Sequence, residues 1–280
     1  MPEPHLVAAT SVSRLLRRIQ EDIAKAEGER VETEVVKRYT CSPGEFHEIE
    51  DFLEESPCKG VSFNAAQESL RFILVLTIVH GACSAWFSEW GSQFPKQVRD
   101  HLRFQTESDV NKLGEDEQSK KVPDNSINVR GRAMPTIALE VGYSESYEDL
   151  INDATLLLEG SQGRIGLVIL VKVTPLTAAL ESIQSGFVET HIYDQVTQKR
   201  AKFRSRMRLY PPTTKHTEQK ITLPWQTILR EKRTAVNPTT ESPPPLVLDE
   251  LRRLIDEAVV QTLLLRSNKT AQAERNASIL

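Results

Sequence analysis

The stretch Pro135-Thr-Ile-Ala-Leu-Glu-Val-Gly-Tyr143 and the thirty residues after it decide the fold. The stretch is apolar and predicts a strand. Residues 144–159 carry Leu150, Ala154, Leu157 and Leu158 at helical spacing, with serine and acidic residues where a helix begins. Gly160 and Gly163 predict the end of that helix. The run Gly166–Val173 is almost wholly apolar and predicts a buried strand.

A strand, a helix and a second strand in this order form a βαβ unit, whose two strands run parallel. Residues 123–129 predict a further strand, joined to Pro135–Tyr143 by a turn at Arg130-Gly-Arg, so that this pair is antiparallel. We therefore expect an α+β protein built on one mixed β-sheet between about residues 60 and 210, with a βαβ crossover and peripheral N- and C-terminal helices.

The rest of the chain predicts appendages to this core. Residues 11–28 and 45–55 are amphipathic or capped helices, 103–121 is a polar loop or weak helix, and 187–193 with 199–209 form a hairpin. Residues 246–266 carry a stripe of leucine, isoleucine and valine. The expected organisation is an N-terminal helical cap (1–58), a core with a C-terminal hairpin (59–233), a linker (234–245), and a C-terminal helix and tail (246–280).

Composition excludes several classes of protein. The chain is 39% hydrophobic and 26% charged with a net charge of −4, values typical of a globular protein rather than a disordered or strongly basic one. Its three cysteines are widely spaced and suit a reducing compartment. No run approaches the length of a membrane span, and residues 1–28 lack an apolar signal segment. The expected location is intracellular, in the cytoplasm or nucleus, without membrane association.

Two acids on the predicted hairpin are candidate metal ligands or catalytic residues. Asp124 and Glu140 lie on neighbouring strands, where two carboxylates can converge on one hard divalent cation that activates water and neutralises charge on a phosphate. Because Asp124 follows a proline, it can also be explained as an ordinary aspartate in a turn. Glu140, flanked by apolar residues, needs a partner or a metal if it is buried, unless it lies at an edge. His80 and Glu89 are expected to be helix-cap or surface residues, and Asp149 and Asp153 to be solvated.

The segments Pro135–Leu150, Leu158–Gly163 and Leu167–Val173, together with Leu76–Phe87, resemble uncharacterised fungal proteins with a restriction-endonuclease-like PD-(D/E)xK core. The resemblance covers about residues 60–210 and is strongest from Pro135 to Val173. It implies that Asp124 is the motif aspartate and Glu140 the motif acid. It also implies a bound magnesium or similar ion and a phosphodiester substrate in nucleic acid.

The sequence departs from this motif at its lysine. The lysine should follow the acid by two residues, but Gly142 stands there. Lys172, on the next strand, is a candidate replacement. The alternative is a lysine at a strand end whose stem is buried and whose ammonium reaches water. The expected catalytic set is thus Asp124, Glu140 and Lys172, with Asp124 and Glu140 as metal ligands. Three hypotheses remain: a magnesium-dependent nuclease with an incomplete or rearranged set, an inactive nucleic-acid- or protein-binding module on the same fold, and a helix-mediated assembly protein.

Basic residues concentrate in one part of an otherwise acidic chain. The segment 199–233 carries eleven lysines and arginines against Glu218 and Glu231. Such a run is either a set of solvated strand faces or a surface for phosphates. We expect it to be the contact for any nucleic-acid partner, and the C-terminal helix to be the contact for any homo-oligomer.

Overall fold

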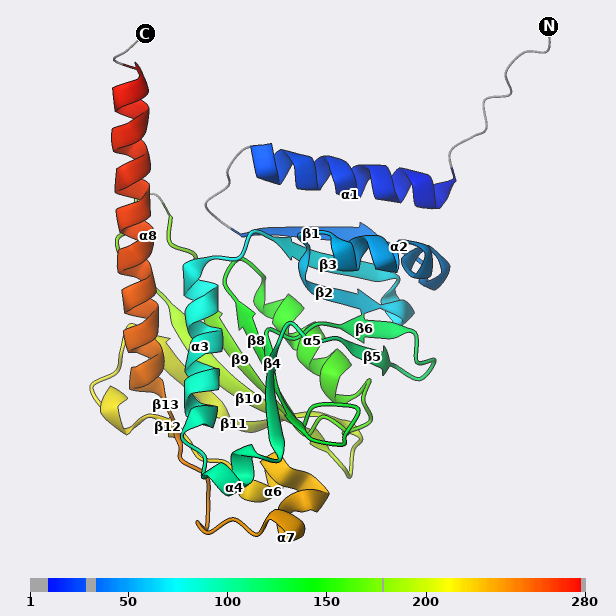
Figure 1. Cartoon of the computed structure of the whole chain (residues 1–280), viewed down its shortest axis with the longest axis vertical. Coiled ribbons are helices and arrows are strands. Elements are labelled where there is room, and N and C mark those ends of the chain that lie inside the picture. Colours follow the sequence, from blue (N-terminus) through cyan, green and yellow to red (C-terminus); the bar gives the residue numbers. More distant parts are fainter. Residues whose placement is uncertain (1–9, 29–33, 178, 278–280) are drawn as a thin grey trace, which may run out of the picture.

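A six-stranded mixed sheet forms the centre of the computed structural model, which describes residues 10–28, 34–177 and 179–277 (Figure 1). In spatial order its strands are β11 (Lys199–Tyr210), β10 (Gly186–Asp194), β9 (Leu167–Val173), β8 (Ile137–Gly142), β7 (Asn125–Val129) and β4 (Leu102–Thr106). Only the β8–β9 pair is parallel, with Glu140 opposite Leu170 and Gly142 opposite Lys172.

The predicted βαβ unit is confirmed. Helix α5 (Tyr147–Leu158) connects β8 to β9 and covers one face of the sheet. It begins with a capping box, in which Ser146 and Asp149 exchange side-chain and backbone hydrogen bonds. Residues of β8 and β9 alternate between the two faces and are almost all buried, which explains the continuous apolar runs.

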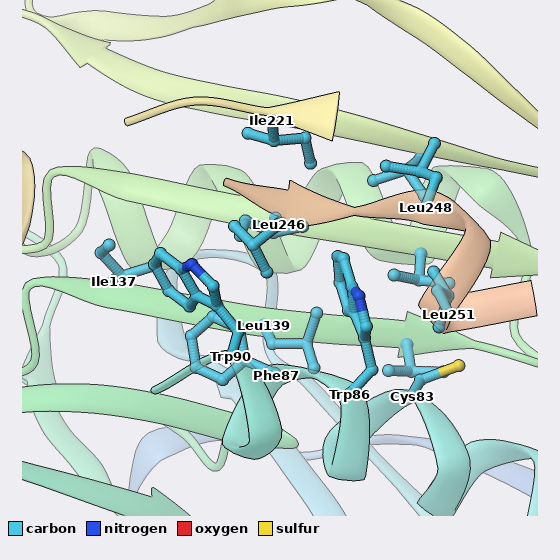
Figure 2. Packing of buried hydrophobic residues seen from close by; sticks show 14 of the residues in the cluster. Cys83, Trp86, Phe87, Trp90, Ile137, Leu139, Ile221, Leu246, Leu248 and Leu251 are labelled. Carbon is cyan, nitrogen blue, oxygen red and sulfur yellow. The ribbon is translucent and has the colours of Figure 1, made fainter. Parts of the chain in front are cut away.

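The opposite face of the sheet is covered by α3 (Ile78–Ser92) and the long C-terminal helix α8 (Leu248–Ala277) (Figure 1). Figure 2 shows Trp86 and Trp90 of α3 in one apolar cluster with Leu139 of β8 and Leu246. Leu248, Leu251 and Ile255 of α8 are fully buried in the same cluster. The leucine stripe of the C-terminal helix therefore packs on this chain's own core.

Tryptophan side chains of the core form hydrogen bonds with the segment before α8. The indole N–H of Trp86 donates to the carbonyl of Val247 (3.0 Å), that of Trp90 to Pro244 (2.6 Å) and that of Trp225 to Thr240 (2.9 Å). These are the chain's three tryptophans. Part of the segment 234–245, expected to be a linker, is thus a bound strap, which ends in β13 (Leu246–Val247) paired with β12 (Lys220–Ile221).

A second, antiparallel sheet stands beside α5 (Figure 1). Its strands, in spatial order, are β1 (Val35–Thr40), β3 (Ser69–Leu74), β2 (Lys59–Asn64), β6 (Ser119–Lys121) and β5 (Val110–Leu113). Helices α1 (Ser11–Gly28) and α2 (Pro43–Glu55) pack on its outer face in a separate apolar cluster. Its inner face carries polar residues toward α5.

The remaining short elements connect these layers. They are α4 (Lys96–Arg99), α6 (Trp225–Leu229), α7 (Arg233–Val236) and the 3-10 turns η1 (Ala65–Gln67), η2 (His216–Glu218) and η3 (Arg230–Lys232). No helix among the described residues is both long enough and apolar enough to span a membrane.

Several expectations were wrong. The expected α+β fold with a mixed sheet is present, but the described residues also form a second large sheet, because residues 35–74 and 110–121 pair among themselves. The stretch 103–121 is not a loop or weak helix: it supplies β5 and β6 and most of β4. Strand β3 ends at Leu74, and Thr77 caps α3 through its hydroxyl. The N-terminal segment also contributes a strand, β1, to the second sheet.

Candidate functional site

The hairpin β7–β8 brings Asp124 next to β8 one position beyond the Asn125–Leu139 pair, beside Glu140. The backbone N–H of Val141 donates to Oδ2 of Asp124 at 2.6 Å. Glu140 lies on the face of β8 that is covered by α5, since its neighbours on either side along β8, Leu139 and Val141, face α3 and α8. The proximity of these two acids in the sheet is as the sequence predicted.

Asp124 is held by a buried histidine. Its Oδ1 lies 2.8 Å from Nε2 of His80, whose Nδ1 lies 2.9 Å from Oε1 of Glu34. Burial disfavours the charged imidazole, but Asp124 and Glu34 outweigh burial and raise the pKa of His80 well above its usual value. Burial likewise opposes ionisation of Asp124, and His80 more than offsets it, so the pKa of Asp124 is lowered. His80 is therefore a buried ion-pair partner and not the cap or surface residue expected. Glu89, by contrast, is a surface residue near Arg253.

Glu140 is paired with a lysine that sequence reasoning missed. Nζ of Lys121, at the end of β6, lies 3.1 Å from Oε2 of Glu140 and 2.9 Å from Oδ2 of Asp153 on α5. The three side chains are only 2%, 1% and 2% exposed. The other oxygen of Glu140, Oε1, is buried without a hydrogen-bond partner among the described residues. Burial raises the pKa of Glu140; Lys121 opposes this shift, while Asp153 and Asp124 add to it.

Arg71 of β3 extends this ionic cluster across the gap between the two sheets. Its Nε lies 3.0 Å from Oε1 of Glu145 and its Nη1 3.2 Å from Oδ1 of Asp149, and it also pairs with Asp153. Ser62 of β2 donates to Oδ1 of Asp153 at 2.9 Å. Asp149 and Asp153 are thus buried partners of the second sheet, and their expected solvation was wrong. Glu145, Asp149 and Asp153 recur every four residues, a signal for one acidic helix stripe that the sequence did offer.

The electrostatics of the stripe differ from residue to residue. Burial raises the pKa of Glu145 to about 7, with Arg71 opposing and Asp153 adding to the shift. The pKa of Asp149 is lowered to about 2, because hydrogen bonds from Ser146 and Arg38 and the charge of Arg71 outweigh its partial burial. One acid of the stripe is therefore poised to take up a proton near neutrality.

Lys172 lies on the same sheet face as Glu140, opposite Gly142 in the parallel ladder. Its ammonium donates to the carbonyl oxygens of Gly142 (3.3 Å), Tyr143 (3.0 Å) and Val173 (3.0 Å). Among the described residues it makes no ion pair with a carboxylate. Burial lowers the pKa of Lys172. The cation beside Glu140 is accordingly Lys121, and Lys172 is engaged with backbone.

The cluster does not fit a divalent cation as it stands. Both oxygens of Asp124 are engaged, by His80 and by the N–H of Val141, and Glu140 keeps one unpartnered oxygen. Across the described parts of the chain, no group of three or more histidine, cysteine or acidic side chains is placed to hold a metal. A hard cation needs several oxygen ligands or waters, and the ammonium of Lys121 takes up one of the Glu140 oxygens.

The first part of the basic segment, residues 199–210, forms the edge strand β11. On the α5 side, Lys202 and Arg206 both contact Oε1 of the buried Glu189, at 3.2 and 2.7 Å, yet remain 53% and 45% exposed. Lys199 pairs with Glu159 of the α5 C-cap, and Arg204 and Arg208 are exposed. The guanidinium of Arg206 also stacks on Phe187, 3.8 Å from the ring centre. Arginines and lysines therefore outnumber their acidic partners along this edge.

No family model, curated protein or solved structure matches this chain.

Proposed function

We propose that this protein is a nucleic-acid-binding module on a restriction-endonuclease-like core, and that it does not cleave its ligand. One observation carries the proposal: the ammonium of Lys121 sits between Glu140 and Asp153 in a site closed to solvent. A nuclease of this class needs a cation and a water beside those acids. Here a side chain of the protein supplies the positive charge, and all three side chains are buried.

The binding half of the proposal rests on β11. Exposed lysines and arginines at a sheet edge neutralise phosphates and give an affinity that falls with salt. The same charges also protect the edge from pairing with other strands, so their presence on an edge strand does not by itself indicate a ligand. The excess of cations over acids on both faces of β11 is what favours nucleic acid.

The test has two arms. Calorimetry with Mg²⁺ or Mn²⁺, and incubation with labelled DNA and RNA, should show neither metal binding nor cleavage. Fluorescence anisotropy with the same nucleic acids should show binding that weakens steeply with salt. Lys199→Ala/Lys202→Ala should weaken binding and lower the salt slope by about 1.4–1.8, given roughly 0.7–0.9 per phosphate contact. Arg253→Ala, an exposed arginine on α8, is the matched control and should leave both unchanged. Salt-independent binding, or none, would reject the binding half.

A second candidate is the metal-dependent nuclease itself, favoured by the unpartnered Oε1 of Glu140. A buried carboxylate oxygen without a partner costs free energy that a ligand can recover. Under this alternative Lys121 stands where the motif lysine acts, and the closed arrangement opens on binding. Metal-dependent cleavage that is lost in both Glu140→Gln and Asp124→Asn would establish it and overturn the non-catalytic assignment.

A further inference from the structure

A groove of about 990 Å³ lies between the two sheets at one end of α5. Its walls are η1 and the β5–β6 loop of the antiparallel sheet, the C-terminal half of α5, and the turn of the β10–β11 hairpin. Its volume is at the upper end of the range for ligand sites in proteins. The buried ionic cluster around Lys121 is not part of it.

The groove is lined by an unusual number of uncharged amides. A carboxamide side chain offers two donors and one acceptor without charge, so it can pair with the edge of a neutral polar group. Asn64 uses its oxygen to cap η1, whereas the side chains of the other five have no hydrogen bond within the parts of the chain that the structure describes. These amides are Asn64, Gln67, Asn152, Gln162, Gln195 and Gln198.

The groove continues into the basic edge. Lys199 lines the groove and begins β11, and Arg200 donates to the hydroxyl of Thr155, another lining residue, at 2.9 Å. Lys202 and Arg206 follow on the same side. A strand of phosphates that tracks β11 would therefore bring its bases to the mouth of the groove.

The groove also holds three acids, two of which lie close to Lys199 at the start of the basic edge. Glu159 is paired with Lys199 (3.0 Å) and accepts the backbone N–H of Arg200. Glu115 and Asp116 lie in the β5–β6 loop, and Glu115 is close enough to Lys199 to stabilise its charge. Both acids repel phosphate and can accept hydrogen bonds from base amino groups. Tyr193 adds an aromatic ring to the lining, a platform on which a base can stack.

We infer that this groove receives unpaired bases of a single-stranded nucleic acid whose phosphates follow β11. The inference rests on the proposed nucleic-acid binding and deepens it. Bases in a duplex are stacked inside and present only their groove edges, whereas bases of a single strand turn outward and offer their pairing edges to amides. The protein should therefore prefer single strands to duplexes.

The experiment compares wild type with a groove variant, Gln67→Ala/Asn152→Ala, whose two side chains are exposed and make no internal hydrogen bond. Anisotropy is measured with labelled single-stranded RNA and DNA of about 12 nucleotides, a length within the known range of single-strand sites, and with duplexes of the same sequence. We expect wild type to bind the single strand at least about tenfold more tightly. The groove variant should lose about tenfold for single strands while keeping its salt slope, because no phosphate contact is removed.

The outcomes separate this inference from the function on which it rests. If wild type binds neither single strands nor duplexes at low salt, the proposed function fails and the groove assignment with it. If wild type binds both forms equally, or the groove variant binds single strands as tightly as wild type does, the groove assignment alone fails. An unchanged melting temperature shows that the variant is folded. Asn152→Asp, which adds a negative charge without changing size, is a second variant and should weaken single-strand binding at least as much.

Discussion

The side chain of Lys172 crosses the space that any side chain at Gly142 would need: its Cδ lies 3.1 Å from the position of a Cβ there. Leu150 Cδ1 of α5 lies closer still, at 2.6 Å. The glycine at the motif position is therefore favoured by the close packing of α5 and β9 on β8. A larger side chain at this position requires Leu150 and Lys172 to shift.

This packing predicts that Gly142→Ala destabilises the fold by about 1–3 kcal/mol, the usual cost of overpacking a filled core. Gly81→Ala on α3 is the control, because its added Cβ meets nothing within 4 Å and alanine favours a helix interior by about 0.5–1 kcal/mol. Urea unfolding measures both. Equal stabilities for the two variants would show that Leu150 and Lys172 move aside freely.

Lys121→Met should destabilise the protein by about 3–5 kcal/mol near neutral pH, because it leaves buried Glu140 and Asp153 without their shared cation. The loss should shrink as pH falls, because burial raises the pKa of Glu140 and a protonated Glu140 carries no charge that needs a cation. Adding Glu140→Gln should recover part of the stability, so that the double variant is more stable than the sum of the single changes predicts. Strict additivity in urea unfolding would mean that the two side chains do not interact.

Glu145 should make the protein less stable as pH rises. Its pKa is about 7 in the folded chain against 4.5 for the free group, so the folded state holds more protons between these values. The free energy of unfolding then falls as pH increases from about 4.5 to 7. Glu145→Gln should remove this part of the slope while keeping the contact with Arg71. Other groups, His80 among them, titrate in both proteins, so the difference between the two pH profiles is the measurement. Parallel profiles would place the pKa of Glu145 near its ordinary value.

The two sides of α8 should respond differently to alanine. Leu251 is fully buried against the core, and Leu251→Ala should cost about 2–5 kcal/mol. Leu264 is 60% exposed, and Leu264→Ala should leave the melting temperature of the monomer unchanged. Light scattering across concentrations tests the predicted oligomer as well. If the chain self-associates through α8, Leu264→Ala should reduce the measured mass; a mass unaffected by this change would exclude Leu264 from the contact.

The core was predictable because its signals are local. Apolar runs of strand length, a serine cap and a pair of glycines lie within forty residues of one another and specify β8, α5 and β9. The antiparallel sheet was not predictable, because β6 is only Ser119–Lys121 and β2, the strand that joins it to the rest of the sheet, is far away in sequence. The same limit applies to the site. The adjacency of Asp124 and Glu140 follows from a hairpin, but nothing in the pair Lys120-Lys121 indicates that Lys120 turns to Glu50 and Lys121 to Glu140.

The strap between residues 240 and 247 affects the tryptophan fluorescence of the protein. Each indole of the molecule donates its N–H to a carbonyl of this one short segment. The intrinsic ultraviolet emission of the whole protein therefore depends on a stretch of eight residues. Release of the C-terminal segment would expose three indoles to water together and shift their emission to longer wavelength, which makes detachment visible without any added label.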